Sequence, residues 1–92
     1  MTIKQQIRNF IEENFMLYRD PDTLDEDKSL LEQGLIDSTG VLELVEGLQS
    51  MFDIRVEDDE IIPRNLGSLN IMTRFIAQKL ENKTGVKTNE ND

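Results

Sequence analysis

The sequence predicts a small all-α fold: a four-helix bundle with three longer helices, one short helix and a long first loop. Apolar residues recur at spacings of three and four over residues 3–16, 38–52 and 68–81, as they do on amphipathic helices. Residues that favour helix N-termini stand at the start of two of these stretches, Thr2 before the first and Ser68 in the last. The length of 92 residues suits one domain with one modest core.

The first helix is predicted over residues 3–16, with Thr2 as its cap. Charged and amide side chains occupy one side of this helix, so the other side is expected to face the core. The apolar side holds Ile3, Ile7, Phe10, Ile11 and Phe15.

A long loop follows over residues 17–33, because Pro21 ends the helical pattern and several aspartates favour turns. The acidic residues do not fit a calcium loop: counted from Asp20, a ligand position holds Leu24 and the required glycine position holds Asp25. Ser29 to Glu32 match a capping box, which predicts a single helical turn. Five apolar residues are expected to attach this loop to the core: Leu24, Leu30, Leu31, Leu35 and Ile36.

The second helix is predicted over residues 38–52, after a loop in which Gly34 can adopt positive φ. Asp37 and Ser38 are both good N-cap residues at its start. Gly47 lowers intrinsic helicity by about 1 kcal/mol relative to alanine but permits a neighbouring element to approach closely. The apolar stripe of this helix comprises Val41, Leu44, Val45, Leu48, Met51 and Phe52.

The pattern changes after Asp53. Residues 54–57 alternate between apolar and charged, which favours a short extended segment. The acids of residues 57–60 open a brief helix that Pro63 is expected to end. The last helix is predicted over residues 68–81. We expect residues 1–83 to form the domain and residues 84–92 to be a flexible C-terminal tail.

Composition excludes several classes of function. The chain has no cysteine and no histidine, so it lacks a thiolate nucleophile, the commonest metal ligand and the usual general base near neutral pH. Ten basic and 19 acidic residues give a net charge of −9, and residues 36–60 hold eight acids against one base, a net charge of −7. This charge repels nucleic acid and attracts basic protein surfaces. No segment approaches the ~20 apolar residues of a membrane span, so a soluble, cytoplasmic protein is expected. We also expect it to be a monomer.

Ser38 is the strongest candidate for a functional residue, although not as a catalyst. A nucleophilic serine needs an adjacent base, and neither a Ser-x-x-Lys pattern nor a nucleophile elbow is present, because positions 41 and 36 are Val41 and Ile36. A paired-carboxylate hydrolase would need a concave site that so small a domain does not offer. No catalytic residue and no metal site are therefore predicted. Ser38 can instead accept a group that another enzyme installs, which requires only exposure, a fixed position and a docking surface.

The segment Leu35-Ile36-Asp37-Ser38, followed by the spaced apolar residues of the second helix, resembles the acyl carrier and peptidyl carrier protein family. The resemblance covers roughly residues 3–80. In that family an aspartate–serine pair stands at the start of the second helix, and the serine carries a 4′-phosphopantetheine arm through a phosphodiester. The apolar residues that carry the resemblance are Leu42, Leu44, Val45, Leu48 and Phe52.

The resemblance implies a role for each matching residue. Ser38 would be the attachment site of the arm, which comes from coenzyme A, and Asp37 would help the modifying transferase engage the serine and the transferase's own magnesium. Acyl or aminoacyl groups would be carried as thioesters on the thiol of the arm. The residues implied to dock partner enzymes are Thr39, Glu43, Glu46, Glu57, Asp58, Asp59 and Glu60.

The implied partners are a phosphopantetheinyl transferase and activating ligases, synthases or transferases with basic docking surfaces. Thr39-Gly40 departs from the family pattern, in which an aliphatic residue commonly follows the serine. A D-alanyl or peptidyl carrier is therefore at least as well supported as a fatty-acid or polyketide carrier. The alternative is a small acidic helical interaction module in which Ser38 is only a helix cap.

Overall fold

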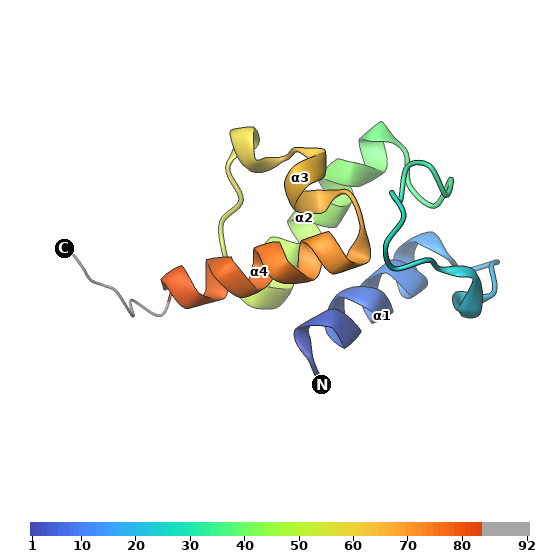
Figure 1. The fold of residues 1–92 in the computed structure, drawn as a ribbon, viewed down its shortest axis with the longest axis horizontal. Helices are drawn as coiled ribbons and strands as arrows, with labels where there is room; N and C mark the ends of the chain where they lie inside the picture. Colours follow the sequence, from blue (N-terminus) through green and yellow to red (C-terminus); the bar gives the residue numbers. More distant parts are fainter. Residues whose placement is uncertain (84–92) are drawn as a thin grey trace.

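The computed structural model describes residues 1–83, which form four α-helices, two short 3₁₀ helices and no strand (Figure 1). The all-α prediction is confirmed, while the expected C-terminal tail at residues 84–92 lies outside the described residues. The elements in chain order are α1 (Ile3–Phe15), η1 (Pro21–Thr23), α2 (Ser38–Phe52), η2 (Asp58–Glu60), α3 (Pro63–Leu66) and α4 (Leu69–Lys83).

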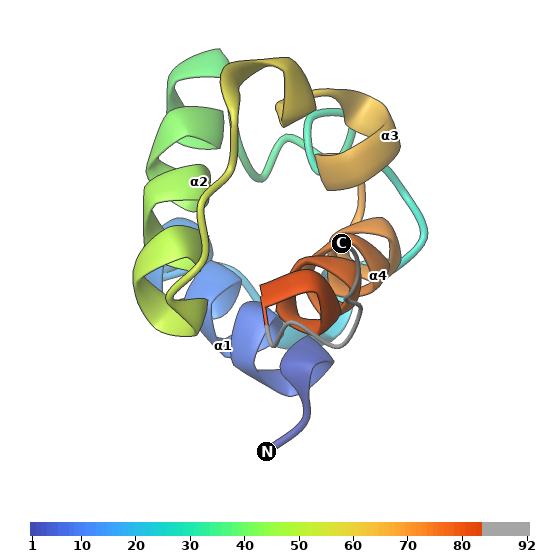
Figure 2. The ribbon, with the colours of Figure 1, turned by 90° about the vertical axis from the view of Figure 1, so that its left-hand side faces the viewer.

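The three longer helices enclose the core. Helix α1 packs against both α2 and α4, and α3 packs against α4. Figure 2 shows α2 and α4 on opposite sides of the bundle, with α1 beneath them and α3 above α4. The seven most completely buried large side chains come from these three helices: Ile7, Ile11, Leu44, Leu48, Leu69, Met72 and Ile76.

The contact between α1 and α2 depends on Gly47. The ring of Phe10 lies against this glycine, and a Cβ atom there would stand 2.1 Å from Phe10 Cζ. No heavier residue fits without displacing the ring, so the expected close approach at Gly47 is confirmed. Phe10 also meets the ring of Phe15 edge to face, with the ring centroids 6.1 Å apart.

The long loop is attached to the core by four of the five predicted residues, since Leu24, Leu30, Leu35 and Ile36 are buried. Leu31 is 52% exposed, so the prediction for this residue is wrong. Residues 30–34 form a hydrogen-bonded turn, and Leu30 takes the inward position in it.

The single helical turn predicted at Ser29 is present as that turn. The N–H of Gln33 donates to the Ser29 carbonyl at 3.0 Å, and the N–H of Glu32 donates to Ser29 Oγ at 3.3 Å. Gly34 follows with φ of 73°, as expected, and its carbonyl accepts from the Arg19 guanidinium.

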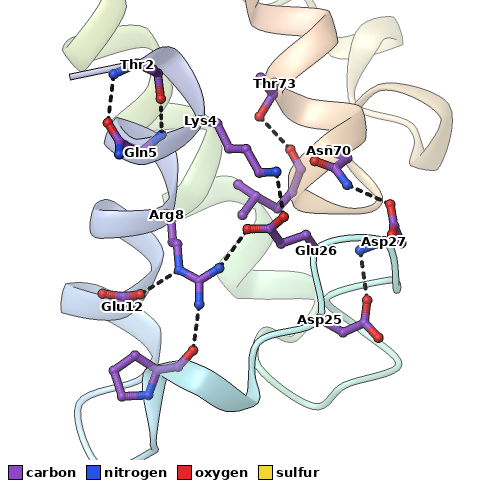
Figure 3. A network of polar contacts seen from close by, with 12 residues as sticks. Thr2, Lys4, Gln5, Arg8, Glu12, Asp25, Glu26, Asp27, Asn70 and Thr73 are labelled. Atoms are coloured by element: carbon purple, nitrogen blue, oxygen red, sulfur yellow. Dashed lines mark hydrogen bonds and ion pairs between the residues drawn. The ribbon is translucent and has the colours of Figure 1, made fainter.

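Polar contacts also fix the loop (Figure 3). Arg8 of α1 donates to Glu12, to Glu26 and to the carbonyl of Pro21, with each distance between 2.8 and 2.9 Å. Lys4 forms a second ion pair with Glu26. The same part of the loop reaches α4, where the Asn70 N–H donates to the Glu26 carbonyl at 3.0 Å. The loop is therefore held between α1 and α4.

The connection from α2 to α4 differs from the prediction. Residues 57–62 do not form one brief helix: η2 covers only Asp58–Glu60, and Pro63 begins α3 instead of ending a helix. Proline is well suited to the first helical position, where its missing N–H leaves no hydrogen bond unmade. Ser68 is confirmed as the cap of α4, since its buried Oγ accepts from the Ile71 N–H at 3.2 Å.

Candidate attachment site and docking surface

The start of α2 is capped by Asp37. Its backbone is extended, with φ −109° and ψ −176°, and its Oδ1 accepts from the Gly40 N–H at 2.7 Å. Ser38 is therefore the first residue inside the helix, and the interpretation of Ser38 as the cap is wrong. Because Asp37 performs the capping, the Ser38 hydroxyl is not needed for it.

Asp37, Ser38 and Thr39 are all exposed, whereas Gly40 is buried. The side chain of Ile36 lies across Gly40, and a Cβ atom at this position would stand 2.6 Å from Ile36 Cγ1. The glycine that departs from the family pattern therefore has a packing role in this chain. Ile36 is itself 9% exposed, so it joins the loop to the core directly before the cap.

The surroundings of Ser38 suit a negative group and do not suit catalysis. The unpaired backbone N–H groups of a first helical turn and the helix dipole favour a negative group at this end. The neighbouring carboxylate of Asp37 is occupied by the Gly40 N–H, and the chain has no histidine to act as a base. Within residues 1–83, no cluster of three or more metal-ligating side chains is present.

Along α2, the first turns present both acidic and apolar groups to solvent. Glu43 and Glu46 are exposed. Leu42, one turn after Ser38, is 57% exposed and was not among the predicted docking residues. It could have been recognised from the sequence, because it falls off the apolar stripe that Val41, Leu44 and Val45 define.

The other predicted docking acids are Glu57, directly before η2, and the three residues of η2, and they differ in their surroundings. Asp58 and Asp59 are exposed. Glu57 pairs with Arg55, whose Nε lies 2.9 Å from Glu57 Oε2. Glu60 is directed to α4, where Lys79 Nζ lies 2.8 Å from its Oε1.

Two contacts, one with the Glu57 N–H and one with Lys79, lower the pKa of Glu60. The hydrogen bond from the Glu57 N–H has the largest effect, and the ion pair with Lys79 adds to it. Because its carboxylate is already paired within the protein, Glu60 is not part of the docking surface proposed below.

An apolar pocket of about 180 Å³ lies close to the start of α2. Val41 and Leu44 of α2 form one side, and the α3 region forms the opposite side through Ile61, Ile62, Pro63, Leu66 and Gly67, while Ser29, Leu30 and Leu31 of the first loop complete the lining. Ile36 lines it as well, so the pocket and the attachment site share the residue that precedes the cap. Ser38 is outside the pocket.

Comparison with known proteins agrees with this arrangement. No protein-family model matches the chain. The D-alanyl carrier protein of Streptococcus sanguinis (strain SK36) is 44% identical over 61 residues, which are 65% of this chain and 72% of that protein. The solution structure of a holo acyl carrier protein from Nitrosomonas europaea superposes with a TM-score of 0.73 at 28% identity, covering 88% of this chain and 99% of that one.

The all-α fold and the two relatives place this chain in one class of protein, the carrier proteins. The chain belongs to the acyl carrier protein family. It is thus a carrier and not itself an enzyme, as the sequence predicted. Within residues 1–83, none of the helices is long and apolar enough to cross a membrane.

Proposed function

We propose that this chain carries acyl or aminoacyl groups as thioesters on a 4′-phosphopantetheine arm attached to Ser38. The observation that supports this most directly is the exposed Ser38 hydroxyl at the first position of α2, left free because Asp37 forms the cap. In the loading reaction, Ser38 Oγ forms a bond to the β-phosphorus of coenzyme A. The bond from that phosphorus to the adenosine bisphosphate portion breaks, and the hydroxyl proton passes to the transferase.

The preferred cargo is a small aminoacyl group such as D-alanine. The support is the 44% identity to a D-alanyl carrier protein. An adenylating ligase would then be the principal partner, delivering the aminoacyl group to the thiol of the arm. Fatty-acid, polyketide and nonribosomal peptide pathways are the competing assignments.

The proposed docking surface surrounds the attachment site on α2. It consists of Thr39, Leu42, Glu43 and Glu46, all of which are exposed. Leu42 offers apolar contact area, while the two glutamates offer charge that would steer a basic partner. Asp58 and Asp59 on η2 are further exposed acidic groups that we add to this surface. This set fits ligases and transferases with basic surfaces.

Loading tests the proposal. The protein, coenzyme A, magnesium and a phosphopantetheinyl transferase of broad specificity are incubated, and the intact mass is recorded. One arm should be added to the natural chain and to Ser50→Ala, and none to Ser38→Ala. Ser50 is the matched control because it is also an exposed serine on α2. A folded natural chain that gains no arm with any transferase would favour the acidic interaction module instead.

A charge-reversal variant tests the docking surface. Glu43→Lys combined with Glu46→Lys should lower the rate of loading about tenfold or more, because both exposed carboxylates steer basic partners. Thermal stability should change little, since exposed charges contribute little to it. The control is Glu13→Lys with Asp22→Lys, which changes the net charge equally at exposed positions outside the surface. If loading slows equally in both variants, the slowing is caused by net charge alone, which would contradict a defined docking surface.

The cargo is tested with the loaded protein. An adenylating ligase specific for D-alanine, supplied with ATP, should produce an aminoacyl thioester on the arm, while an acyl–acyl carrier protein synthetase supplied with a fatty acid should produce much less. The reverse order would assign the chain to fatty-acid chemistry without affecting the assignment of Ser38.

A further inference from the structure

The wall of the apolar pocket that faces α2 is built from a short segment. Ile61, Ile62 and Leu66 line the pocket on this side, across from Val41 and Leu44. Helix α3 packs against α4, and it has only four residues. The contacts that this segment makes with α4 therefore decide how firmly the wall is held.

Glu60 stands directly before this wall and contacts α4, α3 and the residue that precedes η2. Its carboxylate accepts from Lys79 Nζ through both oxygens, at 2.8 and 3.1 Å. Its Oε1 also accepts from the Glu57 N–H at 2.9 Å, and its carbonyl accepts from Asn65 Nδ2 at 2.9 Å. One residue thus links η2 to both α3 and α4.

The surroundings of the Glu60–Lys79 ion pair favour a stable contact between η2 and α4. The side chains of Lys79 and Glu60 are 21% and 29% exposed, so solvent screens their attraction less than it screens a surface pair. Lys79 Nζ also lies 5.7 Å from the centre of the Phe75 ring. Separating the two groups would leave a partly buried carboxylate without its counter-charge, and this carboxylate would be drawn toward water.

We propose that the Glu60–Lys79 ion pair is a latch that holds the α3-side wall of the apolar pocket against α4. When the pair breaks, residues 60–67 move away from α4 and the pocket opens, while the α1, α2 and α4 core stays folded. The latch is a property of the chain without its arm, so it is independent of the proposed attachment at Ser38.

A second ion pair on the same helix supplies a matched comparison. Lys83 lies one turn after Lys79, and its Nζ is 3.0 Å from Asp53 Oδ2 at the end of α2. These side chains are 43% and 94% exposed, and neither residue lines the pocket. The same substitution at Lys83 therefore removes an ion pair from α4 without releasing the pocket wall.

Amide hydrogen exchange of the unloaded protein tests the latch. The reporter amides are those of Asn65, Leu66 and Gly67, which donate to carbonyls at the start of α3, and that of Leu30, which donates to the Gly67 carbonyl at 2.9 Å. Lys79→Met should raise their exchange rates roughly three- to tenfold relative to amides of α2 around Leu48. Lys79→Arg should restore most of the protection, because arginine can pair with the same carboxylate.

Two results would overturn the proposal. One is equal acceleration of the reporter amides in Lys79→Met and Lys83→Met. The other is uniform acceleration across α1, α2 and α4 in Lys79→Met, which would show a loss of global stability instead of local opening. If Lys79→Met does not fold, Glu60→Gln serves in its place, since an amide oxygen can still accept from the Glu57 N–H. Unchanged exchange of the reporter amides in that variant would equally reject the latch.

Discussion

Asp37 caps α2, whereas its neighbour Ser38 is exposed and takes no part in the cap. The Asp37 carboxylate accepts from the Gly40 N–H and closes the first turn of α2, and this frees the Ser38 hydroxyl to face solvent. The sequence indicated that a polar group would cap the helix here, but both residues are good caps. Only the backbone geometry decides between them, because the residue with extended φ and ψ is Asp37.

Substitution of Asp37 should separate its structural role from the role in loading that we propose for it. Asp37→Ala should lower the free energy of unfolding by about 0.5–2 kcal/mol, the usual cost of losing a cap. Asp37→Asn keeps a capping oxygen, so its stability in urea should stay close to that of the natural chain. If the carboxylate also assists the transferase, Asp37→Asn should still load Ser38 more slowly. If Asp37→Asn is loaded at the same rate as the natural chain, then Asp37 acts only as a cap.

At the scale of the element, α2 presents different faces to the core and to solvent. Most of its apolar stripe was predictable from spacing, since Leu44, Val45, Leu48 and Phe52 are buried as expected. Met51 is 37% exposed, so the prediction for that residue is wrong. The α3 region was not predictable in the same way. Pro63 is compatible with either the end or the first residue of a helix, and the choice depends on how residues 61–67 pack against α4.

Two leucines of α2 test this division. Leu48 is fully buried, so Leu48→Ala should lower the free energy of unfolding by about 2–5 kcal/mol. Leu42→Ala makes the same chemical change at a side chain that is 57% exposed, and it should cost about 0.5 kcal/mol or less. Chemical denaturation measures the free energy of unfolding of both variants. A loss well under 1 kcal/mol for Leu48→Ala would show that the assigned core face of α2 is wrong.

At the scale of the whole molecule, ion pairs distant in sequence hold the connections onto the helices. Arg8 and Lys4 secure the first loop through Glu26, and Lys79 secures η2 through Glu60. The sequence could not predict these pairs, because 18 residues or more separate Arg8 from Glu26 and Lys79 from Glu60, and no local pattern marks them. Periodicity and caps, by contrast, are local properties and predicted the four-helix architecture.

The Glu26 ion pairs predict how stability depends on pH. The hydrogen bond from Lys4, with the charge of Arg8 adding to it, lowers the pKa of Glu26 below its ordinary value of 4.5. A lowered pKa in the folded state contributes stability above that ordinary value and loses it as the pH falls through the folded value. The stability difference between the natural chain and Glu26→Gln should therefore be present at about pH 7 and shrink below 4.5.

Urea unfolding at a series of pH values measures this difference. Glu13→Gln is the control, because Glu13 is an exposed acid of the same helix α1 that Lys4 and Arg8 belong to. That control should show little difference from the natural chain at any pH. A Glu26→Gln difference that stays constant down to acid pH would mean that the ion pairs do not stabilise the folded state.

The central claim is that Ser38 alone receives the arm, and fragmentation mass spectrometry of the loaded protein tests it most directly. The chain contains three other serines as internal references: Ser29, Ser50 and Ser68. Ser29 accepts from the Glu32 N–H, Ser68 is buried and Ser50 is exposed within α2. We predict that the mass of one 4′-phosphopantetheine is found on Ser38 and on no other residue. An arm on Thr39 or Ser50, or no arm on a folded chain, would contradict the account.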